Sequence, residues 1–170
     1  LFLKVNRKKT EVSHISKVKY LGYSFYRYKG KCRFRVHSKS VVKMKNRIRE
    51  LTDRNKGISN EVREKKYQEY VRGWVEYFRL ADMKKLLQKT DEWARRRIRA
   101  IYWKQWKKIK TKCRMLKALG LEDWKAKELA NSRKGYWRMA KVLNQIFSNK
   151  IIVKLGYTSM LDYYLVVYEN

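Results

Sequence analysis

The most informative residues are the lysines and arginines between Trp93 and Leu121, a segment that contains no aspartate or glutamate. The nearest carboxylates, Glu92 and Glu122, lie at its two ends, so these cations cannot all be paired within a helix. Such a surface suits a polyanion, because neutralising phosphates releases their counterions. The residues that we expect to contact phosphates are Arg95, Arg96, Arg97, Arg99, Lys104, Lys107, Lys108, Lys110, Lys112 and Arg114.

A second basic set follows Ser40, which we predict to be the N-cap of a helix that ends near Thr52. Apolar residues recur there at helical spacing and define one buried face. The other face is the alternative phosphate-binding surface, and it carries Lys43, Lys45, Arg47 and Arg49.

Aromatic residues are interleaved with the first basic segment at Trp103 and Trp106. One of these rings could stack on an unpaired base, as single-stranded RNA recognition often requires. Alternatively, being three residues apart on a helix, they could anchor that helix on a neighbour. We favour packing for at least one of them. We also expect core positions for Trp74, Phe78, Trp93 and Trp137.

The sequence offers no arrangement for acid/base or metal chemistry. The aspartates are scattered and none is adjacent to another, whereas two-metal phosphoryl-transfer sites need carboxylates in pairs. Cys32 and Cys113 have no Cys or His at metal-ligand spacing, and His14 and His37 are equally isolated. We therefore expect free, buried thiols, no metal, no cofactor and no catalytic residue in this chain.

Composition excludes two classes of protein. Lys and Arg number 45 against 15 acidic residues, a formal net charge of +30, which makes a merely solvated basic face less favoured than a polyanion site. A disordered basic tail would be poor in aromatics, yet the chain has 6 Trp, 13 Tyr and 5 Phe. No apolar run is long enough to span a bilayer, and we expect a cytoplasmic location without membrane partners. Since the chain starts at Leu1 in mid-pattern, we interpret it as the C-terminal part of something longer.

Hydrophobic periodicity changes near Ser38. Before it, alternation predicts strands at 1–5, 18–28 and 32–37, with a turn at 29–31, so that residues 18–37 form a hairpin. After it, helical spacing predicts helices capped by Ser59 or Asn60 and by Asp82, one ending at Gly120, and others at 124–130 and 137–146. The second helix places Arg63 on its exposed face. The tail fits a short strand or helix on either side of Gly156. The fold class is α+β, mainly α: short antiparallel strands followed by a helical bundle.

Four motifs in series resemble one family. They are Arg72–Phe78 (RGWVEYF), Asp91–Arg99 (DEWARRRIR), Trp103–Lys107 (WKQWK) and Arg133–Trp137 (RKGYW). Their order and spacing resemble the maturase-specific thumb, or X, domain of group II intron-encoded reverse transcriptases. Upstream, residues 3–10 resemble the end of the polymerase palm, and residues 19–25 resemble the primer-grip hairpin.

The resemblance implies three parts: a palm end with a primer-grip-like hairpin (1–37), a maturase-specific thumb (38–148) and a C-terminal extension (149–170). It implies binding of group II intron RNA to assist splicing, and holding of an RNA template and DNA primer in the full-length enzyme. Lys9 matches the motif lysine, which implies an accessory catalytic role; the alternative is an ordinary solvated lysine at a strand end. Gly22, lacking a side chain, would let a strand backbone approach nucleic acid. The residues that match the primer grip are Tyr20, Leu21, Gly22 and Tyr23.

Members of this family polymerise DNA with Mg²⁺ held by aspartates that would lie upstream of Leu1. We therefore expect this chain alone to be inactive as a polymerase. Two alternatives remain open. One is a polymerase fragment that works only with a separate fingers-palm portion, and the other is an unrelated structural RNA-binding protein.

Overall fold

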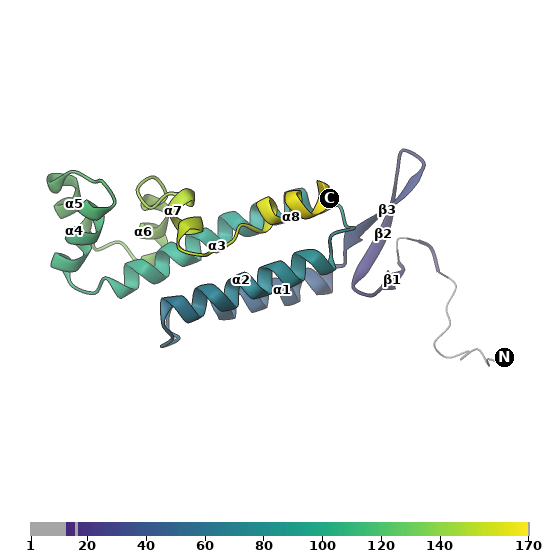
Figure 1. Cartoon of the computed structure of the whole chain (residues 1–170), viewed down its shortest axis with the longest axis horizontal. Helices are drawn as coiled ribbons and strands as arrows, with labels where there is room; N and C mark the ends of the chain where they lie inside the picture. The colour runs from purple at the N-terminus through teal and green to yellow at the C-terminus, as the bar shows by residue number, and fades with distance from the viewer. Residues whose placement is uncertain (1–12, 16, 170) are drawn as a thin grey trace.

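The computed structural model describes residues 13–15 and 17–169, and the predicted strand at 1–5 and Lys9 lie outside them. The molecule is elongated, with a small antiparallel sheet at one end and helices running away from it (Figure 1). The mainly helical α+β prediction is confirmed. The elements are β1 (Lys19–Tyr20), β2 (Tyr23–Tyr28), β3 (Lys31–Val36), α1 (Ser38–Leu51), α2 (Asn60–Tyr77), α3 (Lys84–Gln105), α4 (Ile109–Ala118), α5 (Asp123–Ala130), α6 (Tyr136–Val142), α7 (Asn149–Lys154) and α8 (Met160–Glu169).

The predicted hairpin is present as β2 and β3, which pair in antiparallel register from Tyr23 opposite Val36 to Tyr28 opposite Lys31. Its turn places Lys29 and Gly30 at φ 47° and 75°, as a two-residue turn that matches strand twist requires. The predicted strand at 18–28 is instead interrupted. The chain reverses at Leu21 and Gly22, both with positive φ, so β1 folds back on β2 as a third strand.

Helices α1, α2, α3 and α8 run along the length of the molecule, and α6 and α7 cover the C-terminal half of α3 (Figure 1). Helices α4 and α5 form a separate pair at the end opposite the sheet. Burying the apolar stripes of these helices against one another is the main source of their stability. Side chains in this core that are almost fully buried include Met44, Ile48, Tyr67, Val71, Val75, Leu87, Ile98 and Tyr164.

Helix α8 is docked by a buried carboxylate on α3. Asp91 accepts hydrogen bonds from the Ser159 hydroxyl at 2.8 Å and from the backbone N–H groups of Met160 and Leu161, each at 3.0 Å. It thereby satisfies N–H groups at the start of α8, which have no partner within the helix. Burial raises the pKa of Asp91, although these hydrogen bonds act in the opposite direction. The tail is thus helical on both sides of Gly156.

Helix starts confirm one predicted cap and correct two. Ser59 caps α2 by accepting from Val62 N at 3.3 Å. The N-cap of α1 is His37, whose Nδ1 accepts from Lys39 N, and not Ser40. Asp82 does not cap α3, which begins at Lys84; its carboxylate pairs with Arg33 at 2.8 Å and accepts from the Tyr26 hydroxyl.

Burial corrects several other expectations. Phe78 is buried as predicted, and Trp74 and Trp93 are half-buried, but Trp137 remains 40% exposed. Arg63, predicted on the exposed face of α2, is 1% exposed because its Nη2 turns back to the carbonyl oxygens of the loop before the helix. The free thiols are less buried than expected: Cys32 is exposed and Cys113 half-buried.

Gly22 and Gly30 form a natural pair for testing how the sheet is attached to the helices. A Cβ on Gly22 would lie 2.9 Å from Ser40 Oγ and 3.1 Å from the Phe78 ring, whereas one on Gly30 would meet nothing within 4 Å. Both have positive φ, so Gly30→Ala should cost only the conformational penalty, about 1 kcal/mol. Gly22→Ala should cost roughly 1 to 3 kcal/mol more through overpacking. Urea unfolding of both variants measures this, and equal losses would contradict it.

Candidate nucleic-acid interface

The predicted phosphate-binding residues of α3 are largely occupied by contacts within the protein. Arg97 donates from Nε to Thr52 Oγ1 at 2.7 Å and from Nη2 to Arg49 O at 3.0 Å, which ties α3 to the end of α1. Carbonyl groups at a helix C-terminus carry partial negative charge, so they suit a guanidinium. Burial lowers the pKa of Arg97. This side chain therefore serves first as a link between two helices.

Arg99 and Arg96 are held in the same way. Arg99 is only 2% exposed, and it donates from Nε to Phe147 O and from Nη2 to Asn149 Oδ1, both at 2.8 Å. The expectation that it lies on an open surface is therefore wrong. Burial lowers its pKa to about 10, so it remains a cation at neutral pH. Arg96 bonds to Trp137 O from two nitrogens and stacks on the Trp137 ring at 4.0 Å.

Two lysines of the basic segment also have partners. Lys104 is half-buried and donates to Asn55 Oδ1. Lys112 is half-buried, with its ammonium 4.6 Å from the centre of the Trp103 ring. Both contacts join α3 or α4 to a neighbouring part of the fold, so these cations are less available to a ligand than the sequence suggested.

The remaining cations of the basic segment lie after a break in the helix. Helix α3 ends at Gln105 because Trp106 leaves helical geometry, with ψ of 65°. Trp106 is buried against Trp103 and Phe147, with ring centres 6.1 Å and 6.4 Å away, and Trp103 is buried too. The packing interpretation is thus confirmed for both tryptophans. The chain then turns outward into α4.

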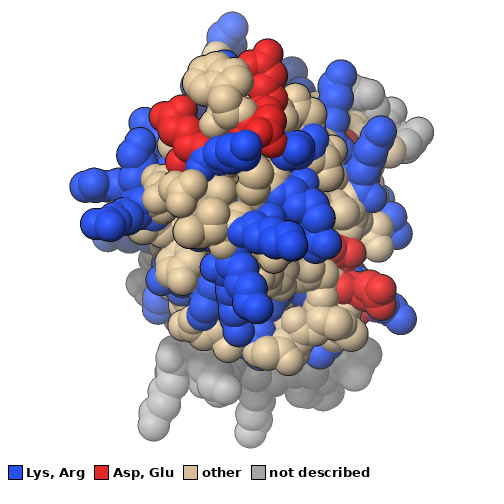
Figure 2. Space-filling model, turned by 90° about the vertical axis from the view of Figure 1, so that its left-hand side faces the viewer, with Lys and Arg blue, Asp and Glu red and all other residues tan. Residues whose placement is uncertain are grey.

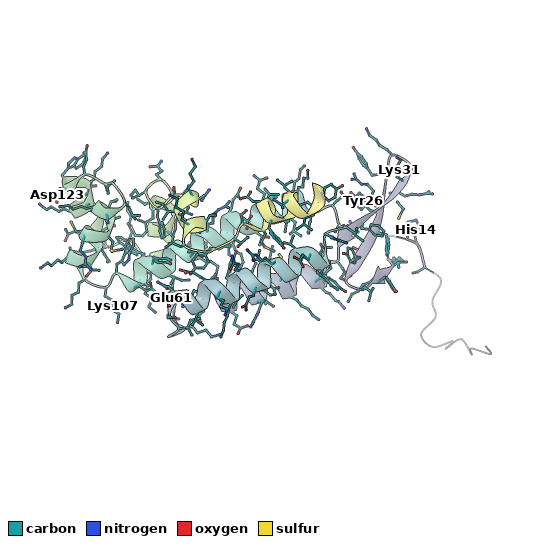
Figure 3. The ribbon with its side chains drawn as sticks, viewed as in Figure 1. His14, Tyr26, Lys31, Glu61, Lys107 and Asp123 are labelled. Carbon is teal, nitrogen blue, oxygen red and sulfur yellow. The ribbon has the colours of Figure 1, made fainter. Side chains whose placement is uncertain are left out.

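Four exposed side chains follow this break, and we call them the α4 cluster: Lys107, Lys108, Lys110 and Arg114. Among the described residues, none of them has a side-chain hydrogen bond or an ion pair. Figure 2 looks at this end of the molecule, where Lys and Arg side chains spread across the middle of the face. Figure 3 shows Lys107 at the α3–α4 junction, far from Tyr26 and Lys31 of the sheet.

Acidic residues lie at the border of this surface (Figure 2). Asp123, at the start of α5, pairs with Lys117 at 2.8 Å and Lys127 at 2.6 Å. The hydrogen bond from Lys117, followed by that from Lys127, lowers the pKa of Asp123 to about 2. The Asp123 carboxylate therefore pairs with these two lysines and does not neutralise the cations of the α4 cluster.

The basic face of α1 is also exposed but is partly paired. Arg47 forms an ion pair with Glu50 at 2.6 Å, and Arg49 donates to Asn46 and lies over the Trp93 ring. Lys43 and Lys45 are exposed, with no side-chain partner among the residues described. Helix α1 therefore offers fewer free cations than α4.

Comparison with known families identifies part of the chain. The family model described as "Group II intron, maturase-specific domain" matches residues 41–120, from α1 to the end of α4. The match supports a group II intron maturase C-terminal region for this part of the chain. This supports a maturase function in group II intron splicing and implies association with group II intron RNA. A search of curated proteins found no match.

The residues that resemble a primer grip lie outside the matched residues 41–120, in β1, β2 and the turn between them. Tyr20 and Leu21 are more than 60% exposed at the turn, whereas Tyr23 is half-buried and its hydroxyl donates to Tyr77 O. The space beside the Gly22 Cα is filled by Ser40 and Phe78. The close approach that Gly22 permits is therefore to α1 and α2, which corrects the expectation that it faces nucleic acid.

One surface feature beside the maturase-specific domain was missed in the sequence. Tyr136 and Trp137 are each about 40% exposed. The guanidinium group of Arg54 lies over the Tyr136 ring, and that of Arg96 lies over the Trp137 ring. The motif at 133–137 marked these residues, but helical spacing suggested a core position for Trp137. Only the short length of α6, seven residues, could have indicated that its first turn stays at the surface.

Two searches found nothing in the part of the chain that the structure describes. No group of three or more His, Cys, Asp or Glu side chains could hold a metal ion. No helix there is both long and apolar enough to cross a membrane.

Arg99 and Lys107 belong to the same basic segment but should differ in what they do for stability. Arg99→Ala would leave the buried Phe147 carbonyl without its donor and open a cavity, which should cost roughly 2 to 4 kcal/mol. Lys107→Ala should change the free energy of unfolding by less than about 0.5 kcal/mol, as exposed sites do. Denaturant unfolding checks both, and an unaffected Arg99→Ala variant would show that its hydrogen bonds do not stabilise the fold.

Proposed function

We propose that this chain assists group II intron splicing by binding the phosphates of intron RNA with the α4 cluster. The observation that supports this most is the position of these cations: they lie within the matched domain, are exposed, and have no partner among the described residues. Exposed cations without counter-charges repel one another, which is a cost that a polyanion would remove.

Contacts to phosphate rather than to base edges fit this surface. The major groove of an RNA helix is deep and narrow, whereas its phosphates are accessible to long lysine side chains. Trp103 and Trp106 are buried, so these two rings are not available to stack on a base. The interaction should therefore be mainly electrostatic and strongly dependent on salt.

A wider role belongs to the proposal as well. Residues 1–37 would form the end of a polymerase palm, and the exposed Tyr20 and Leu21 would contact a primer-template duplex. Mg²⁺ would be held by aspartates of the fingers-palm portion and not by this chain. Under this proposal the basic surface and the sheet, at opposite ends of the molecule, would contact different parts of the nucleic acid.

Removing the α4 cluster should flatten the salt dependence of RNA binding. Each neutralised phosphate contributes about 0.7 to the log-log slope for single strands, so replacing Lys107, Lys108, Lys110 and Arg114 by Gln should reduce the slope by roughly 3. The measurement is fluorescence anisotropy with a labelled single-stranded RNA and with a folded intron RNA, over a range of salt concentrations.

A matched control removes the same charge from another surface. Lys65, Lys66, Lys85 and Lys89 are exposed on α2 and the first turns of α3, and they have no side-chain partner among the described residues. Replacing them by Gln should change the slope by less than about 1, through the long-range field alone. If both quadruple variants lose the same slope, the binding surface is not the α4 cluster, and Lys43 and Lys45 on α1 become the next candidates.

The chain alone should not incorporate nucleotides on an RNA template with Mg²⁺ or Mn²⁺, because two-metal catalysis needs paired carboxylates. Adding a separate fingers-palm fragment should restore extension if the sheet completes the polymerase. Template-dependent extension by the pure chain would refute the first expectation. Absence of any effect of the chain on the fragment would refute the wider role while leaving RNA binding intact.

A further inference from the structure

A basic pocket lies between α3 and α6, away from the α4 cluster. Its volume is about 380 Å³, more than tenfold the roughly 30 Å³ that one water occupies in the liquid. Arg95, Arg96 and Arg99 line it from α3, and Lys141 lines it from α6. Asn144 and Asn149 complete the polar wall. All of these side chains can donate hydrogen bonds, and the three arginines and the lysine are also cations.

Arg99 is the fixed element of this pocket. Its side chain is 2% exposed, and its Nε and Nη2 atoms are held by Phe147 O and Asn149 Oδ1. Among the described residues, its third nitrogen, Nη1, has no hydrogen-bond partner, and the residue lines the pocket. A buried guanidinium with a free donor beside an open space is pre-organised for an anion, because ordering it costs nothing on binding.

The other cations add charge around this donor. Arg96 is held by Trp137 O, whereas Arg95 and Lys141 have no side-chain hydrogen bond or ion pair among the described residues. Asn149 accepts from Arg99 through its oxygen, which leaves its amide N–H groups as further donors. These groups surround the pocket with positive charge and donors.

Carboxylates near the pocket do not cancel this charge. Glu92 is exposed and lines the pocket, and it accepts from Gln88 at 3.4 Å rather than pairing with an arginine. Asp91 attracts Arg95, but its oxygens are occupied by Ser159 and the start of α8. The pocket therefore keeps a net positive charge.

We propose that this pocket binds one phosphodiester group of an RNA strand, with Arg99 Nη1 as the central donor and Lys141 closing the site from α6. The inference rests on the proposed function for the identity of the strand. Guanidinium groups match the geometry of a phosphate's non-bridging oxygens, which favours phosphate over a base edge. Helix α6 lies beyond the matched residues 41–120, so the pocket would extend the RNA contact outside the maturase-specific domain.

The direct test follows the side-chain Nε–Hε resonances of the full chain by NMR while a single-stranded uridine octanucleotide is added. The hydrogen bond of Arg99 Nε to Phe147 O protects this proton from exchange and makes its resonance observable. Binding in the pocket should shift the Arg99 resonance in a saturable way. A purely structural Arg99 would not respond.

Affinity for the same oligonucleotide provides a second readout with a matched control. Lys141 and Lys134 are both exposed and lie close in sequence, but only Lys141 lines the pocket. Lys141→Gln should weaken binding roughly twofold to fivefold, the range of a single exposed charge pair, whereas Lys134→Gln should change it by less than about 1.5-fold. Neither substitution removes a buried contact, so both variants should keep the parental unfolding midpoint.

The outcomes separate this inference from the proposed function. If the RNA binds but the Arg99 resonance stays in place and the two lysine variants behave alike, the pocket assignment is wrong and the α4 cluster still stands. If RNA does not bind while inorganic phosphate shifts the Arg99 resonance, the pocket is a site for free phosphate, which overturns its assignment to RNA. If neither ligand shifts the resonance, the pocket is not an anion site.

Discussion

An excess of positive charge, without enough carboxylates to neutralise it, is the constraint on which this structure depends. Lys and Arg outnumber acidic residues 45 to 15, and in the described residues the ion pairs involve only Asp82, Glu50 and Asp123. Buried guanidinium groups therefore bond to backbone carbonyl oxygens, as Arg63 and Arg99 do. Arginine suits this role because it has five donors and stays charged when burial lowers its pKa.

This constraint divides the basic residues by type and position. Along α3, the guanidinium groups of Arg96, Arg97 and Arg99 are bonded to other parts of the fold, and the exposed cations of the basic segment are mainly lysines beyond the break at Trp106. The break exists because Trp103 and Trp106 pack inward with Phe147, so the aromatic core determines where the free charge appears. The basic segment that looks uniform in sequence thus contains structural cations followed by a surface that is free to bind a polyanion.

The sequence predicted what depends on neighbouring residues and failed where distant contacts decide. Period-two alternation and the Gly30 turn identified the hairpin, and helical spacing identified most helices, because both signals are local. Asp82 looked like a helix cap, but Arg33 and Tyr26 across the sheet are stronger partners for its carboxylate. Arg99 looked exposed because periodicity cannot reveal that the turn after α6 lies over it. The residues of the α4 cluster were predicted as part of a longer basic segment. The point where its unpaired cations begin depends on the packing of Trp106 on Phe147, which is a contact between residues distant in the sequence.

The matched domain at residues 41–120 does not complete its own core. Asp91 is satisfied by the start of α8, Arg99 by the turn after α6, and the Trp106 ring by Phe147, all of which lie beyond residue 120. Without those partners the Trp106 indole would be exposed to water at a cost in free energy, and Asp91 and Arg99 would lose the hydrogen bonds that hold the C-terminal segments against α3. The C-terminal helices are therefore needed to hold the break at Trp106 in place, and through it the orientation of the α4 cluster. The same turn after α6 also positions Arg99 in the basic pocket, so one set of contacts beyond the matched domain determines both cationic surfaces.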